Sequence, residues 1–269
     1  MNIKTIVKLA LKEDVANGDI TTNSLIKENK TISANFVAKE DGVICGLDIA
    51  KMVFQQLDKS IVFKKVAIDG QEIKKYQVIA KISGNVKTIL TGERTSLNFL
   101  QHLSGIATLT KKFVDSAGKN TKIYDTRKTT PLLREVEKYA VRCGGGYNHR
   151  LNLSDMVLIK DNHLELVKNF DLDIKSFPKN KKIEIEAQNY EHVKQFVILN
   201  PDIIMLDNMD YVEMRKSIKY IRKHSDCEIE ISGNVSAKTI EELASLKPDR
   251  ISVGIITHSA PSIDISLEF

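Results

Sequence analysis

Apolar and polar positions follow two different patterns in the two halves of the chain. In the first ninety residues the pattern predicts helices at 3–13 and 48–57, two strands within 31–46 and an antiparallel sheet within 61–90. A long helical stretch from about Glu93 to Ser116 leads into the second half. The first half therefore predicts a domain of mixed α/β structure.

In the second half, short apolar runs recur every twenty to thirty-odd residues. They are 123–127, 157–161, 183–186, 203–207, 229–233 and 251–254. Most of them are separated by helix-like stretches such as 190–199, 210–224 and 236–246. This alternation predicts a parallel sheet, either in a barrel or in an open doubly wound sheet. The first loop lacks the GxGxxG pattern, which weakens a dinucleotide-binding interpretation.

Most of these runs end in a charged residue or a glycine. The residues at the predicted strand ends are Arg127, Lys160, Glu186, Asp207, Ser232, Gly233 and Gly254. In a parallel β/α barrel the active site lies at the carboxyl ends of the strands. If the sheet is a barrel, we expect these residues to converge.

Composition narrows the class of protein. The 269 residues are 42% apolar and 28% charged, the balance of a folded globular protein. No apolar run approaches the length of a membrane helix, and the N-terminus has no signal-peptide pattern, so we expect a cytoplasmic protein without a membrane partner. Three widely spaced cysteines argue against a disulfide framework or a cysteine-rich zinc site.

The net charge of +5 is concentrated in one segment. Residues 127–160 contain seven basic and three acidic residues, so they carry +4. A solvated basic face and a nucleic-acid surface are two interpretations, although the chain has no tryptophan and no basic-aromatic RNA motif. A pocket for a strongly anionic small molecule is the third interpretation.

The chemistry of the strand ends favours that third interpretation. Glu186 and Asp207 follow each other on consecutive strands, as carboxylates that bind Mg²⁺ together with substrate phosphates do. The glycines at 233 and 254 allow the backbone to approach a phosphate. The cations Arg127, Lys128, His149, Arg150 and Lys160 suit a ligand with several carboxylates and phosphates. Pairing of each carboxylate with a neighbouring cation, and simple tight turns, are the alternatives.

Longer motifs give the chain a family resemblance. They are Thr126-Arg127-Lys128-Thr129-Thr130-Pro131, Gly144-Gly145-Gly146-Tyr147-Asn148-His149-Arg150, Leu158-Ile159-Lys160-Asp161-Asn162-His163, Met205-Leu206-Asp207-Asn208, Ile231-Ser232-Gly233 and Thr257-His258-Ser259. Glu13-Asp14 and Gly92-Glu93-Arg94 fit upstream. In this order they resemble quinolinate phosphoribosyltransferase, also called nicotinate-nucleotide pyrophosphorylase (carboxylating), over nearly the whole chain.

The resemblance implies a fold and a reaction. The expected fold is α/β, with an N-terminal α/β sandwich domain (1–104) and an incomplete parallel α/β barrel (105–259). A C-terminal tail (260–269) is expected to pack back on the first domain. The implied reaction transfers the phosphoribosyl group of 5-phosphoribosyl 1-diphosphate to quinolinate. It releases diphosphate and CO₂, forms nicotinate mononucleotide for NAD biosynthesis and uses Mg²⁺.

The resemblance also assigns residues. Arg127, His149, Arg150 and Lys160 would bind quinolinate, and Arg94 would reach in from the other subunit of a homodimer. Thr129 would be a further substrate-binding residue. The catalytic residues would be Lys128 and Lys160 on the diphosphate side, with Glu186 and Asp207 beside the ribose and Mg²⁺. The 5-phosphate would be bound by Ser232, Gly233, Asn234, Val253, Gly254, Ile255 and His258.

Two positions depart from the family pattern, because Leu132 and Asn234 stand where glycine is usual. Asparagine tolerates a positive φ, so we expect Asn234 to keep its turn. Three alternatives remain: a ModD-like paralogue with another acceptor, a non-catalytic anion-binding barrel, and a nucleic-acid binder. The cations Arg127 and Arg150 favour quinolinate, and the acids Glu186 and Asp207 argue against simple anion binding.

Overall fold

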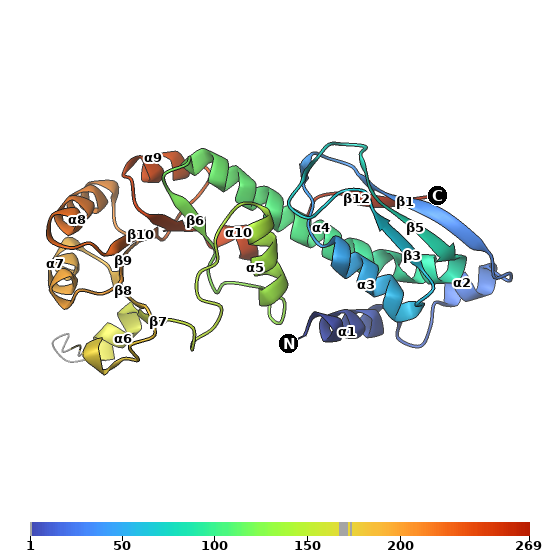
Figure 1. The fold of residues 1–269 in the computed structure, drawn as a ribbon, viewed down its shortest axis with the longest axis horizontal. Helices are drawn as coiled ribbons and strands as arrows, with labels where there is room; N and C mark the ends of the chain where they lie inside the picture. The colour runs from blue at the N-terminus through green and yellow to red at the C-terminus, as the bar shows by residue number, and fades with distance from the viewer. Residues whose placement is uncertain (1, 167–171, 173) are drawn as a thin grey trace. The chain divides into compact units, whose positions relative to one another are not determined.

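The computed structural model describes residues 2–166, 172 and 174–269 of the chain. It contains two compact units (Figure 1). The first unit comprises Met1–Lys111, Thr129–Gly145 and Ile256–Phe269, and the second comprises Lys112–Lys128 and Gly146–Ile255. Within the described residues no helix combines the length and the apolar character needed to cross a membrane.

The first unit is built on a four-stranded antiparallel sheet in the order β12-β1-β5-β3. Its strands are β1 (Thr31–Ala38), β3 (Val62–Lys65), β5 (Val78–Asn85) and β12 (Ile265–Glu268). Phe36 of β1 lies opposite Ala80 of β5 on one side and Leu267 of β12 on the other. The C-terminal segment is thus an edge strand of this sheet.

The helices of this unit begin at residues suited to the position. They are α1 (Ile3–Val15), α2 (Ile20–Leu25), α3 (Leu47–Leu57), α4 (Val86–Ala117), α5 (Arg134–Cys143) and the short α10 (Ile255–His258). Asn2 and Asp19 cap α1 and α2, because their side-chain oxygens accept the N–H groups of Lys4 and Thr22. Hydrogen bonds from the Thr22 side chain and from its backbone N–H lower the pKa of Asp19.

An apolar cluster fills the space between the sheet and its helices. Strands β1, β3, β5 and β12 contribute to it together with α3 and α4. Three rings meet at its centre: Phe36 lies 6.1 Å from Phe54 and 5.5 Å from Phe63, measured between ring centroids. Burial of this surface is the main stabilising contribution of the unit.

One local expectation is wrong and several details go beyond the sequence pattern. Residues 86–90 belong to α4 and not to the antiparallel sheet, because the Asn85 side chain accepts the Lys87 N–H and starts the helix there. The short strand β2 (Gly42–Val43) pairs with β4 (Glu72–Ile73). The sequence pattern also missed α2 and α5.

The second unit is a six-stranded parallel sheet. Its strands are β6 (Lys122–Tyr124), β7 (Val157–Ile159), β8 (Ile183–Ala187), β9 (Ile203–Asp207), β10 (Glu228–Ser232) and β11 (Arg250–Ser252). Its helices are α6 (Asp161–Leu166), η2 (Ile174–Ser176), α7 (Tyr190–Leu199), α8 (Tyr211–His224) and α9 (Ile240–Ser245). All six predicted strands are present, and the region predicted as helical at 236–246 is helical only from Ile240.

The strand order decides between the two architectures that the pattern left open. The order is β6-β11-β10-β9-β8-β7, so β7 to β11 are neighbours in sequence order without a reversal. Right-handed crossovers then place all connecting helices on one face, which curls the sheet into a barrel. A doubly wound sheet needs a reversal. The predicted fold class, an α/β protein with an incomplete parallel barrel, is therefore confirmed.

The two faces of this parallel sheet differ in chemistry. One face is apolar and consists of residues such as Ile185 on β8, Ile204 on β9 and Ile231 on β10, all completely buried. The alternate positions carry Glu184 and Glu186 on β8, and their counterparts on β10 and β11 are Glu230, Ser232, Arg250 and Ser252. The helices cover the apolar face, so the polar side chains occupy the interior of the barrel.

Candidate active site

The carboxyl ends of the parallel strands carry the residues that the sequence singled out. Arg127 and Lys128 follow β6, Lys160 follows β7, Glu186 lies near the end of β8, and Asp207 and Ser232 end β9 and β10. Gly254 follows β11. Because all six strands run in parallel, these ends lie at one edge of the sheet.

Two guanidinium groups form the cationic part of this edge. Arg150 is only 8% exposed; its Nη1 donates to the Met156 carbonyl at 3.3 Å, and its buried Nε has no hydrogen-bond partner among the described residues. Burial and the positive charge of Arg127 lower the pKa of Arg150, while the carboxylates of Glu184 and Glu186 act in the opposite direction. A buried, incompletely paired guanidinium next to a second one is suited to an anionic ligand.

The acidic part of this edge consists of Glu186 and Asp207, together with Lys160, which contacts Glu186. Lys160 Nζ lies 2.5 Å from Glu186 Oε1. Burial raises the pKa of Glu186, Lys160 opposes that rise, and the charge of Asp207 adds to it. The Asp207 carboxylate accepts a hydrogen bond of 2.9 Å from the Asn208 side chain. The structure therefore brings Arg127, Arg150, Lys160, Glu186 and Asp207 into one electrostatic cluster.

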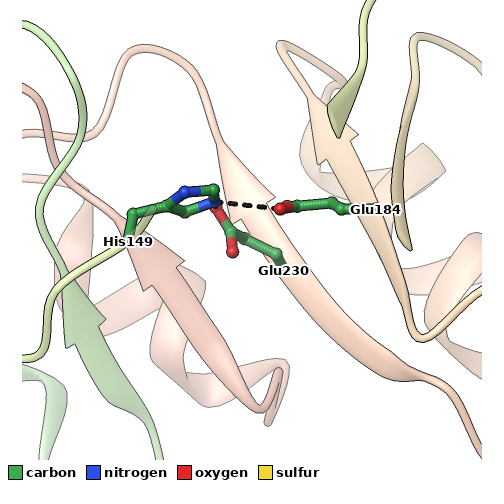
Figure 2. Close-up of side chains that lie close together, drawn as sticks. All are labelled: His149, Glu184 and Glu230. Atoms are coloured by element: carbon green, nitrogen blue, oxygen red, sulfur yellow. Dashed lines mark ion pairs between the residues drawn. The ribbon is translucent and has the colours of Figure 1, made fainter. Parts of the chain in front are cut away.

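His149 points from the neighbouring loop into the interior of the barrel, toward Glu184 and Glu230 (Figure 2). Its Nε2 lies 2.9 Å from Glu184 Oε2 and 3.6 Å from Glu230 Oε1. Both glutamates are completely buried, and the Ser252 hydroxyl donates to Glu230 Oε1 at 2.5 Å. Burial, followed by the charge of Glu184, raises the pKa of Glu230 well above its ordinary value.

The other nitrogen of the His149 ring determines what this cluster can bind. Nδ1 accepts the N–H of Arg150 at 2.8 Å, so the ring proton lies on Nε2. A protonated Nε2 has no lone pair for a metal ion, although the nitrogen and the two carboxylates lie within 4.8 Å of one another. Two pairs of carboxylates can thus be compared, Glu184 with Glu230 and Glu186 with Asp207. The second pair is the better set of ligands for Mg²⁺.

Asp125 fixes the backbone that carries His149. This completely buried carboxylate follows β6 and accepts the N–H of His149 at 2.9 Å and the side-chain amide of Asn148 at 2.6 Å. Tyr147 extends the same segment alongside Tyr124 of β6. The loop is thereby tied to the first strand of the sheet.

The turn after β10 has an unusual backbone conformation. Gly233 has a φ of 90° and Asn234 a φ of 50°. A Cβ at position 233 would lie 2.1 Å from the Asn208 side-chain oxygen, so glycine is required there. Asn234 keeps the left-handed turn, as expected, whereas Leu132 adopts a φ of 69° with 65% of its surface exposed.

Three predicted site residues lie in the first unit. Arg94 is exposed on α4, Thr129 accepts a hydrogen bond from Arg134 Nε at 3.0 Å, and His258 is exposed at the end of α10. Their roles stay predictions.

The sequence analysis missed Glu184, Glu230, Asp125 and Ser252. A signal for the two glutamates was present, because the strands read Ile-Glu-Ile-Glu and Glu-Ile-Glu-Ile-Ser. Strict alternation is unusual for a buried parallel strand, which normally reads as a continuous apolar run. The alternation indicates that one face of the sheet lines a polar interior.

Comparisons with known proteins agree with this geometry. The family model "Quinolinate phosphoribosyl transferase, C-terminal domain" matches residues 106–268, and that of the N-terminal domain matches residues 19–104. A protein of Synechocystis sp. named probable nicotinate-nucleotide pyrophosphorylase [carboxylating] is 40% identical over 96% of this chain and 89% of its own length. A protein of the same name from Methanocaldococcus jannaschii is 41% identical over 98% and 95%.

Solved structures agree as well. The crystal structure of NadC from Streptococcus pyogenes superposes with a TM-score of 0.94 at 40% identity, over 99% of this chain and 95% of that one. The nicotinate-nucleotide pyrophosphorylase from Francisella tularensis gives a TM-score of 0.89 at 39% identity, over 99% and 95%. With both family models and these relatives spanning nearly all of its length, the chain belongs to the quinolinate phosphoribosyl transferase family.

Proposed function

We propose that the protein transfers the phosphoribosyl group of 5-phosphoribosyl 1-diphosphate to quinolinate. The products are nicotinate mononucleotide, diphosphate and CO₂, so the enzyme is a pentosyltransferase of NAD biosynthesis. The names of the relatives support this reaction. The observation that carries it is that two guanidiniums, those of Arg127 and Arg150, occur together with the acids Glu186 and Asp207. The reaction takes place on soluble substrates, and we propose the cytoplasm as its location.

The cationic part of the cluster accounts for the choice of acceptor. Quinolinate carries two adjacent carboxylates, and each can take two parallel hydrogen bonds from a guanidinium. Arg127 and the incompletely paired Arg150 supply the guanidiniums, and Lys160 adds a point charge. His149 and Thr129 complete the proposed binding residues. A monocarboxylate such as nicotinate would leave part of this charge unpaired.

The acidic part accounts for the donor. Breaking the bond between ribose C1 and diphosphate leaves positive charge on the ribose ring, which Glu186 and Asp207 can stabilise. Lys128 and Lys160 offset the negative charge of the departing diphosphate. Glu186 and Asp207 offer the oxygen atoms that Mg²⁺ prefers, and bound Mg²⁺ would supply further positive charge for the diphosphate. Because Lys160 contacts Glu186, we expect these acids to act on the ion partly through substrate or water.

The turns at the ends of the last two strands are the proposed 5-phosphate site. Ser232, Gly233 and Asn234 would contribute on β10, and Val253, Gly254 and Ile255 would contribute after β11, with His258 nearby in sequence. The positive φ angles of Gly233 and Asn234 support this role, because successive backbone N–H groups in such a turn can face an anion. Fixing the phosphate and the carboxylates together aligns the pyridine nitrogen with C1.

The chemistry needs no covalent intermediate with the protein. The pyridine nitrogen attacks C1, the C1–diphosphate bond breaks, and the ring becomes cationic. The carboxylate next to that nitrogen then leaves as CO₂, its electron pair stays on the ring carbon, and a proton replaces it. The protein has to position the two substrates, neutralise their negative charges and exclude water from the reacting atoms. The buried charges of the cluster agree with these requirements.

The test is a turnover assay with quinolinate, 5-phosphoribosyl 1-diphosphate and Mg²⁺. Product formation is measured by the absorbance of the pyridine nucleotide and by the release of CO₂. We expect product from quinolinate, none from nicotinate, and loss of turnover on chelation that Mg²⁺ restores. Turnover of another acceptor without any from quinolinate would contradict the proposal and favour a paralogous enzyme.

We further propose a homodimer in which Arg94 acts in the partner's site. The exposed position of Arg94 on α4 supports this. Arg94→Ala and Lys160→Ala are each expected to be inactive alone. Mixing them under conditions that exchange subunits should restore part of the activity, since each mixed dimer regains one intact site. Mixtures that stay inactive although dimers exchange would contradict an action across the interface.

A further inference from the structure

Glu184, which contacts His149 and through it the backbone of Arg150, has no assigned part in the reaction. The link begins on β8, where the completely buried Glu184 faces the His149 ring (Figure 2). From the ring it continues to the backbone N–H of Arg150. Glu184 lies two residues before Glu186 on the same face of the strand. Its carboxylate is buried from solvent and contacts His149, so we expect any influence on binding to pass through other residues.

One hydrogen bond and one ion-pair contact of the His149 ring define the direction of this link. Nδ1 accepts the Arg150 N–H, so the proton of the neutral ring lies on Nε2, and that nitrogen lies 2.9 Å from Glu184 Oε2. A carboxylate oxygen opposite Nε2 suits this tautomer. Asp125 fixes the main chain of His149 from the other side. The orientation of the ring, and with it the position of the Arg150 backbone, is therefore set by buried groups.

Charge gives Glu184 a second connection to the same residue. The guanidiniums of Arg127 and Arg150 repel each other, and this repulsion lowers the pKa of Arg150. The carboxylates of Glu184 and Glu186 act in the opposite direction and raise that pKa. Glu186 also contacts Lys160, which takes up part of its charge. Without Glu184, less negative charge would balance the two arginines. We would then expect the two guanidiniums to move apart or to bind other anions.

We propose that Glu184 is a positioning residue for substrate binding: through His149 it holds Arg150 in place to receive a carboxylate of the dicarboxylate substrate. This inference rests on the proposed function. It extends that function to a group which has no direct contact with the substrate.

Glu230 provides a matched control. It has the same side chain, the same complete burial and a place on the same interior face, two strands away. It lies farther from His149 Nε2, at 3.6 Å, and is not among the groups that act on Arg150. Glutamine at 230 can still accept from the Ser252 hydroxyl, so a general effect of altering the interior would appear in both variants.

The experiment measures the dissociation constants of quinolinate and of 5-phosphoribosyl 1-diphosphate by calorimetry on the full-length protein. We expect Glu184→Gln to weaken quinolinate binding about 10- to 100-fold, the loss of one contact to a charged group, and to leave the donor within threefold. Glu184→Asp, which keeps the charge, should recover most of the affinity, and Glu230→Gln should bind quinolinate within threefold of the wild type.

A merely structural role predicts a different result. Glu184→Gln would then lower the unfolding temperature and leave the quinolinate affinity of the folded protein unchanged, which would overturn the proposal. Equal weakening by Glu184→Gln and Glu230→Gln would also overturn it. In both cases the wild type still binds and converts quinolinate, so the proposed function stands. A wild type that does not bind quinolinate would contradict both the proposed function and the role of Glu184.

The tautomer supplies a readout that is independent of the substrate. A long-range ¹H–¹⁵N spectrum of the wild-type protein distinguishes the two neutral imidazole forms. We expect His149 to show the proton on Nε2. A proton on Nδ1 would contradict the link from Glu184 to the Arg150 backbone.

Discussion

The two sheets of the molecule have opposite interiors. The antiparallel sheet of the first unit encloses an apolar cluster with the rings of Phe36, Phe54 and Phe63 at its centre. The parallel sheet of the second unit has its apolar face under the helices and encloses Glu184, Glu186, Glu230 and Arg250. The two interiors differ in what they contribute, because the first is apolar and stabilises the fold, whereas the second carries buried charged groups beside the proposed site.

This difference has a physical cost. Burying a charge is unfavourable unless it is paired, so the barrel interior stabilises the fold less than apolar filling would. The apolar face of the same sheet and the helices over it have to offset that loss. Substitutions in the two interiors should therefore change different measured quantities.

The largest expected effect is on stability in the first unit. Phe54→Ala removes a completely buried ring and should lower the free energy of unfolding by about 3–5 kcal/mol. Denaturant unfolding measures the change, and kcat/KM of the folded protein should stay within threefold. Val62→Ala, at a residue 64% exposed on β3, is the control and should change little. A small effect of Phe54→Ala would contradict the role of this cluster.

The next effect is on catalysis in the second unit. Arg150→Lys keeps the charge but loses the planar fork of donors, so we expect kcat/KM for quinolinate to fall about 10²- to 10³-fold. Arg222→Lys on α8, where Arg222 pairs with Asp249 on the surface, should be nearly neutral. Steady-state kinetics tests both variants. Similar losses in the two would show that arginine geometry at position 150 has no special role.

A smaller effect concerns pH. The pKa of Glu230 is raised in the fold, so its contribution to stability is present below the unfolded value of about 4.3 and is lost as the pH rises toward the folded value. As the pH rises above about 4.3, the wild type should lose stability relative to Glu230→Gln, by at most about 1.4 kcal/mol per pH unit. Parallel stability curves for the two proteins would rule this out.

The smallest effect concerns Leu132, which has a positive φ of 69°. Leu132→Gly removes backbone strain of roughly 1–2 kcal/mol but adds disorder to the unfolded chain, so we expect a net gain of about 0.5–1 kcal/mol. Leu153, an exposed loop leucine, is the control, and Leu153→Gly should not stabilise. Thermal unfolding compares the two. A loss of stability on Leu132→Gly would indicate that the leucine side chain has a contact of its own.

Periodicity predicted the parallel sheet well. All six strands appear because each is a short apolar run, and α7 begins and ends at the predicted residues 190 and 199. The choice between a barrel and a doubly wound sheet was beyond the periodic pattern, since it depends on the spatial order of the strands. Helices α2 and α5 were missed because α2 is only six residues long and α5 mixes buried charged residues such as Glu137 and Lys138 with its apolar positions.

The sequence placed the strand-end residues where the structure has them, although their roles stay predictions, and it missed the buried residues one step deeper. Lys160, Glu186 and Asp207 follow from the rule that parallel strands end at one edge. Glu184 and Glu230 lie in the middle of their strands, where a buried carboxylate is not expected. Only the structure shows that His149 turns toward them, because that contact joins three segments far apart in the sequence.

The most direct test compares two neighbours on β8 that point to opposite faces, Ile185 and Glu186. The measurement is kcat/KM for quinolinate at a temperature where every variant is folded. Glu186→Gln should lower it about 10²- to 10³-fold by removing a charge from the site, and Ile185→Ala should stay within threefold of the wild type because it weakens only the packing under the helices. Equal losses in the two variants would contradict the separation of a stabilising face from a catalytic one.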